Sequence, residues 1–331
     1  MPCAKYKSAR QRVLTGAARQ FLLASKGQKN AVLGVFSHNL LPIFLAVCAG
    51  YALSASLRID ARPLSQVGFL VFSPCLVFDI IVDTALPSEA VVRMVGFTSA
   101  SLLGLGAVTA LLARCLCWPR PLTASAILVV LLPNSGNLGL SATLFAFGEQ
   151  GLAHASVFFV TSAVITFTVG VFIASLGRAP LAEALWGLVK VPAIWAVMLA
   201  LLSINTGWSL PLPARRATEL LAEACIPTFL VILGMQLHGT ALTGPLSKVI
   251  AASGIRLAGG FTWGFMLTSA FGLEGAAQQA AVLQSAMPSA VICSVLASEY
   301  DVEPAFATSV VFVTTLVSPL VLTPIVAMLS P

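Results

Sequence analysis

Long apolar runs separated by short polar joints make up most of the chain after residue 37. A helix that crosses a bilayer needs about 20 mostly apolar residues. The joints carry the prolines and charges expected at helix ends, as in the segment from Arg58 to Arg62. The pattern predicts an all-α membrane protein with ten transmembrane helices. The predicted spans are residues 38–57, 64–83, 92–117, 122–147, 152–177, 186–206, 217–238, 248–271, 276–298 and 304–329.

The composition indicates that lipid is the main solvent of this chain. Hydrophobic residues make up 58% and charged residues only 9%, with a mean hydropathy of +0.96. Soluble domains carry roughly a quarter charged residues, so this chain has too little polar surface to cover a water-soluble globule. We therefore expect a multi-pass protein of a cell membrane, either a plasma membrane or a bacterial inner membrane.

The net charge of +6 comes largely from the N-terminus. Seven of the 18 Lys and Arg residues lie within residues 1–30, and no acidic residue occurs there. This composition is typical of a targeting segment or of a solvated basic tail, so residues 1–30 stay outside the fold prediction. It does not indicate a nucleic-acid partner, and none is expected.

The chain repeats itself with an offset of 153 residues. The sequence VFFVTSAV at 157–164 returns as VVFVTTLV at 310–317, and Pro74 matches Pro227 at the same offset. Each repeat then holds five helices, and because five is odd the second repeat must be inverted in the bilayer. Many secondary carriers are built this way, with the substrate site near the midplane where the repeats meet. The predicted repeats are residues 31–177 and residues 178–331.

The fourth predicted helix, residues 122–147, contains a break surrounded by polar groups. Pro133 has no N–H to bond the carbonyl of Val129, and Asn134 and Asn137 bring side-chain amides to the same level. In lipid, a broken helix persists only where protein or a water-filled cavity satisfies the freed groups. These residues are therefore candidates for binding a polar substrate. The alternative is that the asparagines are hydrogen-bonding contacts between packed helices.

The ninth predicted helix, residues 276–298, carries the counterpart of this break in the second repeat. Pro288 frees the carbonyl of Gln284, and the side chains of Gln284 and Ser289 flank the proline. Two breaks at matching places in an inverted repeat are expected to meet at the midplane and to form the substrate site together. The alternative is a packing kink without a binding role.

Asp79 is a carboxylate well inside the predicted span 64–83. A charged side chain at the bilayer centre costs roughly 2.5–3.5 kcal/mol on insertion scales, which favours a group that binds a coupling proton. Asp83, four residues later on the same face, is its candidate partner. The alternative for Asp79 is an ion pair with Arg256 or Lys190. Those two basic residues lie near predicted helix ends, where long side chains usually reach the membrane interface.

Several motifs occur in an order and spacing typical of one transporter family. They are LLPIFLAVCAGYAL, FLVFSPCLVFDII, PNSGNLGL followed by FGEQGL, IPTFLVILGMQL, and AMPSA followed by ASEYDVEPAFATSVVFVTTLVSPLVL. In these motifs the chain resembles the auxin efflux carrier family, which includes plant carriers and shorter bacterial permeases. The resemblance covers nearly all of residues 38–329.

The resemblance implies a fold related to the bile-acid-sodium symporters, with ten helices in inverted repeats and broken helices 4 and 9 crossing at the site. It also implies export of small organic anions, such as indole-3-acetate in plants and dicarboxylates in some bacterial relatives. The chain departs from the family in three places. The fourth-helix motif reads Gly139-Leu140-Ser141 where the family has Gly-x-Pro, and Ser294 or its neighbours stand where the plant carriers have a second proline in the ninth helix. The long loop of the plant carriers is also absent.

We therefore expect a secondary transporter that exports or exchanges a small organic anion by alternating access, with proton coupling as one option. The alternatives are an intramembrane enzyme, a channel or sensor, and a sodium-coupled organic anion symporter. No cofactor, no metal and no catalytic residues are expected. The expected partners are the anion and the lipid bilayer, with a homodimer as a further option.

The distribution of basic residues between joints predicts the orientation. Joints after helices 1, 3, 5 and 7 hold eight Lys or Arg residues and those after helices 2, 4, 6 and 8 hold three. This places the first set in the cytoplasm and both termini outside, although the basic tail favours the reverse. In either case, cysteines introduced at Ser88 and Ala179 should react with a membrane-impermeant maleimide from opposite sides. Labelling of both from one side would contradict the inverted five-plus-five arrangement.

Overall fold

The computed structural model describes residues 34, 36–57, 59–175, 191–238, 242 and 244–330. These residues form helices and no named strand, which confirms the all-α prediction for this part of the chain. Short π-helical segments, labelled η, interrupt several α-helices. The predicted tail 1–30 and the beginning of the predicted sixth span lie outside the described residues.

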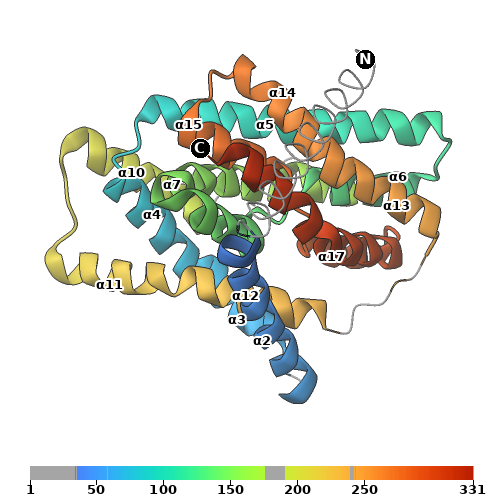
Figure 1. Cartoon of the computed structure of the whole chain (residues 1–331), viewed down its shortest axis with the longest axis horizontal. Coiled ribbons are helices and arrows are strands. Elements are labelled where there is room, and N and C mark those ends of the chain that lie inside the picture. Colours follow the sequence, from blue (N-terminus) through green and yellow to red (C-terminus); the bar gives the residue numbers. More distant parts are fainter. Residues whose placement is uncertain are drawn as a thin grey trace, which may run out of the picture.

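The helices of the first half of the chain are shown in Figure 1. They are η1 (Phe36–Leu40), α2 (Leu41–Leu57), α3 (Ala61–Val67), η2 (Gly68–Phe72), α4 (Ser73–Asp83), α5 (Ser88–Cys115), α6 (Arg120–Leu131), η3 (Ser135–Leu140), α7 (Ser141–Ile165), η4 (Thr166–Gly170) and α8 (Val171–Ala174).

The second half of the chain is helical as well. Its elements are α10 (Pro192–Thr206), α11 (Leu212–Glu223), α12 (Cys225–Leu237), α13 (Leu246–Gly254), η5 (Ile255–Gly259), α14 (Gly260–Ala270), α15 (Gly275–Ser285), α16 (Ile292–Glu299) and α17 (Pro304–Leu329). A proline in the first turn begins α6, α10, α11 and α17, where its missing N–H costs nothing.

Five helical stretches within the described residues are long and apolar enough to cross a bilayer. The shorter apolar helices include α6, which stops at Leu131 because the chain leaves the helical conformation there. One predicted joint lies inside α7 as it is bounded above. Between the predicted spans 122–147 and 152–177, two helices meet at a sharp kink at Gly148, where φ is 66° and ψ is −164°, a conformation that only glycine adopts easily. The five spanning stretches are residues 61–83, 88–115, 135–174, 212–237 and 304–329.

Close helix packing at glycines joins the two halves of the chain. Helix α2 lies against α12, and Figure 1 shows the two side by side. A Cβ atom at Gly50 would overlap the carbonyl group of Val231, and one at Gly234 would overlap that of Val47. Small residues allow such close backbone approach between membrane helices, so these two glycines set the distance between α2 and α12.

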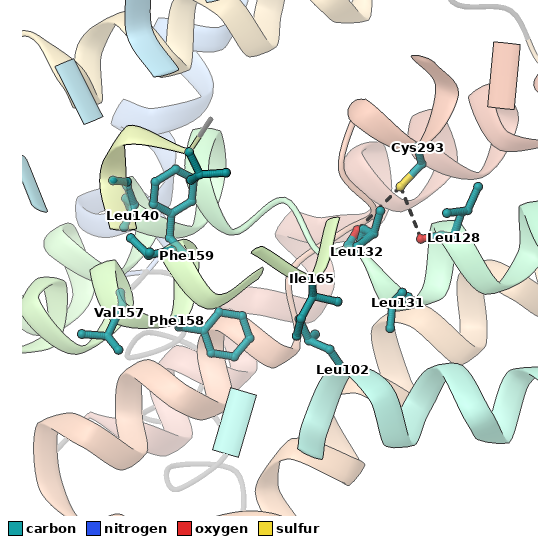
Figure 2. Close-up of a cluster of buried hydrophobic side chains, with 14 of the residues drawn as sticks. Leu102, Leu128, Leu131, Leu132, Leu140, Val157, Phe158, Phe159, Ile165 and Cys293 are labelled. Atoms are coloured by element: carbon teal, nitrogen blue, oxygen red, sulfur yellow. Dashed lines mark hydrogen bonds between the residues drawn. The ribbon is translucent and has the colours of Figure 1, made fainter. Parts of the chain in front are cut away.

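The largest buried apolar cluster surrounds the end of α6. It includes Leu131 of α6, Leu102 of α5 and Phe158 of α7, each at most 1% exposed. Figure 2 shows these side chains, with Ile165 and Leu102 lying between Phe158 and Leu131 in this view. The end of α6 is therefore packed against buried apolar side chains of α5 and α7.

Candidate functional site

The two predicted breaks lie against each other in the structure. Pro133, in the break after α6, and Ser289, in the break after α15, form an isolated antiparallel β-bridge. The Asn134 N–H donates to the carbonyl of Pro288 at 2.7 Å, and the Ala290 N–H donates to the carbonyl of Leu132 at 2.9 Å. The non-helical segments of the two halves thus satisfy part of each other's backbone hydrogen bonding.

The carbonyl that Pro133 deprives of its helical partner is bonded by a side chain from the other half. The hydroxyl of Ser289 donates to the carbonyl oxygen of Val129 at 2.6 Å. Ser289 is fully buried, and its own N–H donates to the hydroxyl of Thr314 at 3.1 Å. Ser289 therefore holds the end of α6, the break after α15 and α17 together.

A buried thiol makes further contacts with the end of α6. The Cys293 Sγ lies 3.4 Å from the carbonyl oxygen of Leu128 and 3.8 Å from that of Leu132 (Figure 2). Cys293 belongs to the first turn of α16, the helix that follows the second break. The thiol is a weak donor, so it supplements the backbone hydrogen bonds at this end of α6.

Arg256, in η5, lies between the two broken helices. Its guanidinium donates to the carbonyl oxygens of Val130, near the end of α6, and Ser285, at the end of α15. The whole residue is buried. A Cβ at Gly260 would lie 2.6 Å from a guanidinium nitrogen, so the absence of a side chain there makes room for Arg256.

The expectation that Arg256 reaches the membrane interface or pairs with Asp79 is therefore wrong. The guanidinium has several N–H donors and can bond the freed carbonyls of both broken helices at once. It therefore stays buried at the breaks and does not extend to the membrane interface. A signal was present in the sequence. An arginine inside an apolar run is followed four residues later by Gly260, which lies one helical turn away.

Three side-chain amides at the breaks are buried with unsatisfied polar atoms. Asn134 is 4%, Asn137 6% and Gln284 0% exposed. Among the described residues, no hydrogen-bond partner is found for the Asn134 Nδ2, the Asn137 Oδ1 or either polar atom of the Gln284 amide. A Cβ at Gly139 would overlap the Gln284 amide, so Gln284 of α15 reaches the segment η3 that follows the first break.

A neighbouring amide on α12 was missed in the sequence. The Asn137 Nδ2 donates to the Gln236 Oε1 at 3.4 Å, and the Gln236 Nε2 donates to the Ser65 hydroxyl at 3.4 Å. This links the first break to α12 and α3. Gln236 gave no signal because its own helix is unbroken, and only the packing of α12 against η3 brings it to the site.

The two candidate coupling carboxylates lie in a different polar cluster. Asp83, at the end of α4, accepts from Arg215 of α11 at 3.4 Å, and Arg215 also pairs with Glu219 at 2.8 Å. Asp79 is partly buried on α4 and makes no ion pair among the described residues. Lys190, its other candidate partner, lies outside the described residues. The structure therefore brings the six candidate substrate-binding residues together at the two breaks. Asp79 and Asp83 make no hydrogen bond or ion pair to those six residues within the part of the chain that the structure describes.

The chain is similar to known transport proteins along nearly all of its length. A family described as membrane transport protein matches residues 35–183 and residues 176–326. An uncharacterised transporter of Methanothermobacter thermautotrophicus is 28% identical over 187 residues, which are 56% of this chain and 61% of that protein.

A second relative has a similar degree of likeness. An uncharacterised transporter of Methanocaldococcus jannaschii is 28% identical over 200 residues, 59% of this chain and 65% of that protein. The matched part of this chain thus spans less than two thirds of the length of both relatives.

Removing the Ser289 hydroxyl tests whether the breaks stabilise each other. In Ser289→Ala the carbonyl of Val129 loses its donor and stays buried, which should lower the free energy of unfolding by about 1–3 kcal/mol. The matched control is Ser298→Ala, because this exposed serine on the neighbouring helix bonds only its own turn and should change stability by less than about 0.5 kcal/mol. Thermal unfolding in detergent measures both. Equal melting temperatures for the two variants would contradict the role of Ser289.

Proposed function

The chain belongs to the membrane transport protein family, which is auxin-efflux-like, and on this basis we propose that it is a secondary transporter of a small organic anion. It is an integral, multi-pass membrane protein. In the proposed mechanism, the anion binds where the two broken helices meet and is exposed alternately to the two sides of the membrane.

The reciprocal packing of equivalent helices from the two halves supports an inverted repeat of ten spans. The offset of 153 residues carries α2 onto α10 and α4 onto α12. Helix α2 packs against α12, and α10 packs against α4, as a pseudo-two-fold axis requires. The same offset relates the kink at Gly148 to Asp301, which also has a positive φ.

The direction of the crossing segments supports the inversion. The two breaks occupy similar positions in their repeats, yet they pair antiparallel through Pro133 and Ser289. Equivalent segments that run in opposite directions are related by a two-fold axis perpendicular to them, and in inverted-repeat carriers such an axis lies in the plane of the membrane.

The observation that carries the functional proposal is the set of unsatisfied amides at the breaks. A buried polar atom without a partner costs about 1–3 kcal/mol, and such atoms are rare in folded proteins. Asn134, Asn137 and Gln284 concentrate four of them at one place. Side-chain N–H groups donate to carboxylate oxygens, so a bound organic anion would satisfy the donors among them.

The helix N-termini at the breaks also favour a negatively charged ligand. The helices that restart after the breaks are η3 with α7 in the first half and α16 in the second. Their N-termini carry partial positive charge, and such ends bind anions readily. Together with the amide donors of Asn134 and Gln284, they make a carboxylate the best-matched substrate group.

The other functional classes receive less support from these residues. An aspartyl-type intramembrane enzyme needs two facing acids, whereas Asp79 and Asp83 share one helix and Asp83 pairs with Arg215. The metalloprotease run H-E-x-x-H does not occur in the sequence. Both relatives are named as transporters. A channel would differ from a carrier in showing no saturation and no stimulation of flux by substrate on the opposite side.

Removing the amide of Asn137 tests the substrate site. Asn137→Leu keeps the size of the side chain but removes its amide. One Nδ2 hydrogen bonds Gln236, and the second can donate to an anion. Losing a hydrogen bond to a charged partner costs about 1.5–3 kcal/mol, or roughly tenfold to a hundredfold in transport. The measurement is uptake of labelled mono- and dicarboxylates into proteoliposomes. The control Asn205→Leu changes an exposed asparagine at the end of α10 and should transport normally. Normal transport by a folded Asn137→Leu protein would reduce the asparagines to packing contacts.

Replacing Asp79 tests proton coupling. Asp79→Asn mimics a permanently protonated carboxylate, so the variant should still exchange substrate but should not respond to an imposed pH gradient. Asp301→Asn is the control, because asparagine tolerates the positive φ of that exposed position and the pH response should persist. Should Asp79→Asn remain fully driven by the pH gradient, Asp79 does not carry the coupling proton.

A further inference from the structure

We propose that Arg256 is a tethered cation that occupies, at the crossing of the broken helices, the position of a bound metal ion. The protein is then expected to fold and to work without sodium at this position. The consequence for transport rests on the function proposed above, whereas the consequence for stability does not.

The partners of Arg256 are those that a coupling cation uses in other carriers. Helix α6 ends at Leu131 and α15 ends at Ser285, and Arg256 bonds a carbonyl in the last turn of each. Each helix C-terminus carries about half a negative elementary charge. In inverted-repeat carriers, unwound carbonyls and half-helix C-termini coordinate Na⁺. In this protein the Arg256 guanidinium bonds such carbonyls.

The charge of Arg256 is balanced by these carbonyls and not by an acid. A guanidinium stays protonated in proteins, and Arg256 is completely buried. The ion pairs among the described residues involve Arg93 and Arg215 but not Arg256. An isolated buried charge is very costly, so the two helix ends must supply the compensation.

Two glycines of α14 leave room for the guanidinium of Arg256 and for the end of α15. On one side, Gly260 has no side chain, and a Cβ there would overlap both Arg256 and the Ser285 carbonyl. A Cβ on Gly264, one turn later, would lie 2.5 Å from the Ser285 Cβ. The backbone of α14 thus closes directly over the end of α15, with Arg256 between them and α6.

This arrangement gives the crossing a net preference for anions. Four helix ends meet there: two C-termini with partial negative charge and two N-termini with partial positive charge. Arg256 neutralises the C-termini of α6 and α15, whereas the N-terminal ends after the breaks keep their positive charge. A mobile cation at the same place could leave, but a tethered one holds this bias through every step of a transport cycle.

The test is chemical rescue of stability in the absence of substrate. Arg256→Ala removes the cation, and its melting temperature in detergent should fall by at least 5 °C. Guanidinium chloride at 10 mM should recover part of this loss, while tetramethylammonium chloride at the same concentration, which cannot donate hydrogen bonds, should not. The control Arg216→Ala, at an exposed position, should match the wild-type protein in all three salts. The wild-type melting temperature should be the same in NaCl and in choline chloride.

Two further variants decide the question if Arg256→Ala does not fold. Arg256→Lys keeps the charge, and Arg256→Met has similar length without it, so the lysine variant should melt several degrees higher. Equal stability of these two, a sodium-dependent wild-type protein, or an Arg256→Ala protein that is stable and indifferent to guanidinium would each overturn the proposal. Because no substrate is present, a failure here is distinct from a failure of the transport proposal. Sodium-independent flux in proteoliposomes is expected in addition.

Discussion

Lipid offers no hydrogen bonds, so every carbonyl freed where α6 and α15 stop must find a donor inside the protein. The donors come from distant parts of the chain: the Ser289 hydroxyl bonds Val129, and the Arg256 guanidinium bonds Val130 and Ser285. The backbone of each break also bonds the other. Neither broken helix is satisfied alone. This requirement accounts for the contact between the two halves of the chain and for the position of α14 over the end of α15.

Where the two breaks pack together, some side-chain amide groups stay without hydrogen-bond partners among the described residues. Backbone donors and carbonyls at the breaks are largely paired, whereas the Asn134 Nδ2 and both polar atoms of the Gln284 amide are buried without partners among the described residues. In the proposed carrier, these amides and the positive helix ends are the groups that an organic anion engages. Stability and binding would thus be divided between two sets of residues that lie side by side, which lets substrate come and go without opening the junction between the breaks.

The breaks could be predicted from the sequence because proline chemistry is local: Pro133 and Pro288 remove known hydrogen bonds whatever surrounds them. The apolar spans were equally readable, since each depends on a continuous run of residues. The carbonyl partners of Arg256 could not be predicted in this way, because they are 126 and 29 residues away in sequence. Gln236 reaches the site only through the packing of α12. The break at Gly148 could be predicted as well, because a polar Gly-Glu-Gln-Gly run interrupts the apolar pattern there.

The central claim, that an organic anion binds where the broken helices meet, is tested most directly by seeing the anion there. A bromine-labelled carboxylate that competes for flux can be added to the protein before electron cryo-microscopy. The account predicts carboxylate density within hydrogen-bonding distance of Asn134, Asn137 or Gln284, with Arg256 still on its two carbonyls. Density for the compound at another place, with these amides unoccupied, would contradict it.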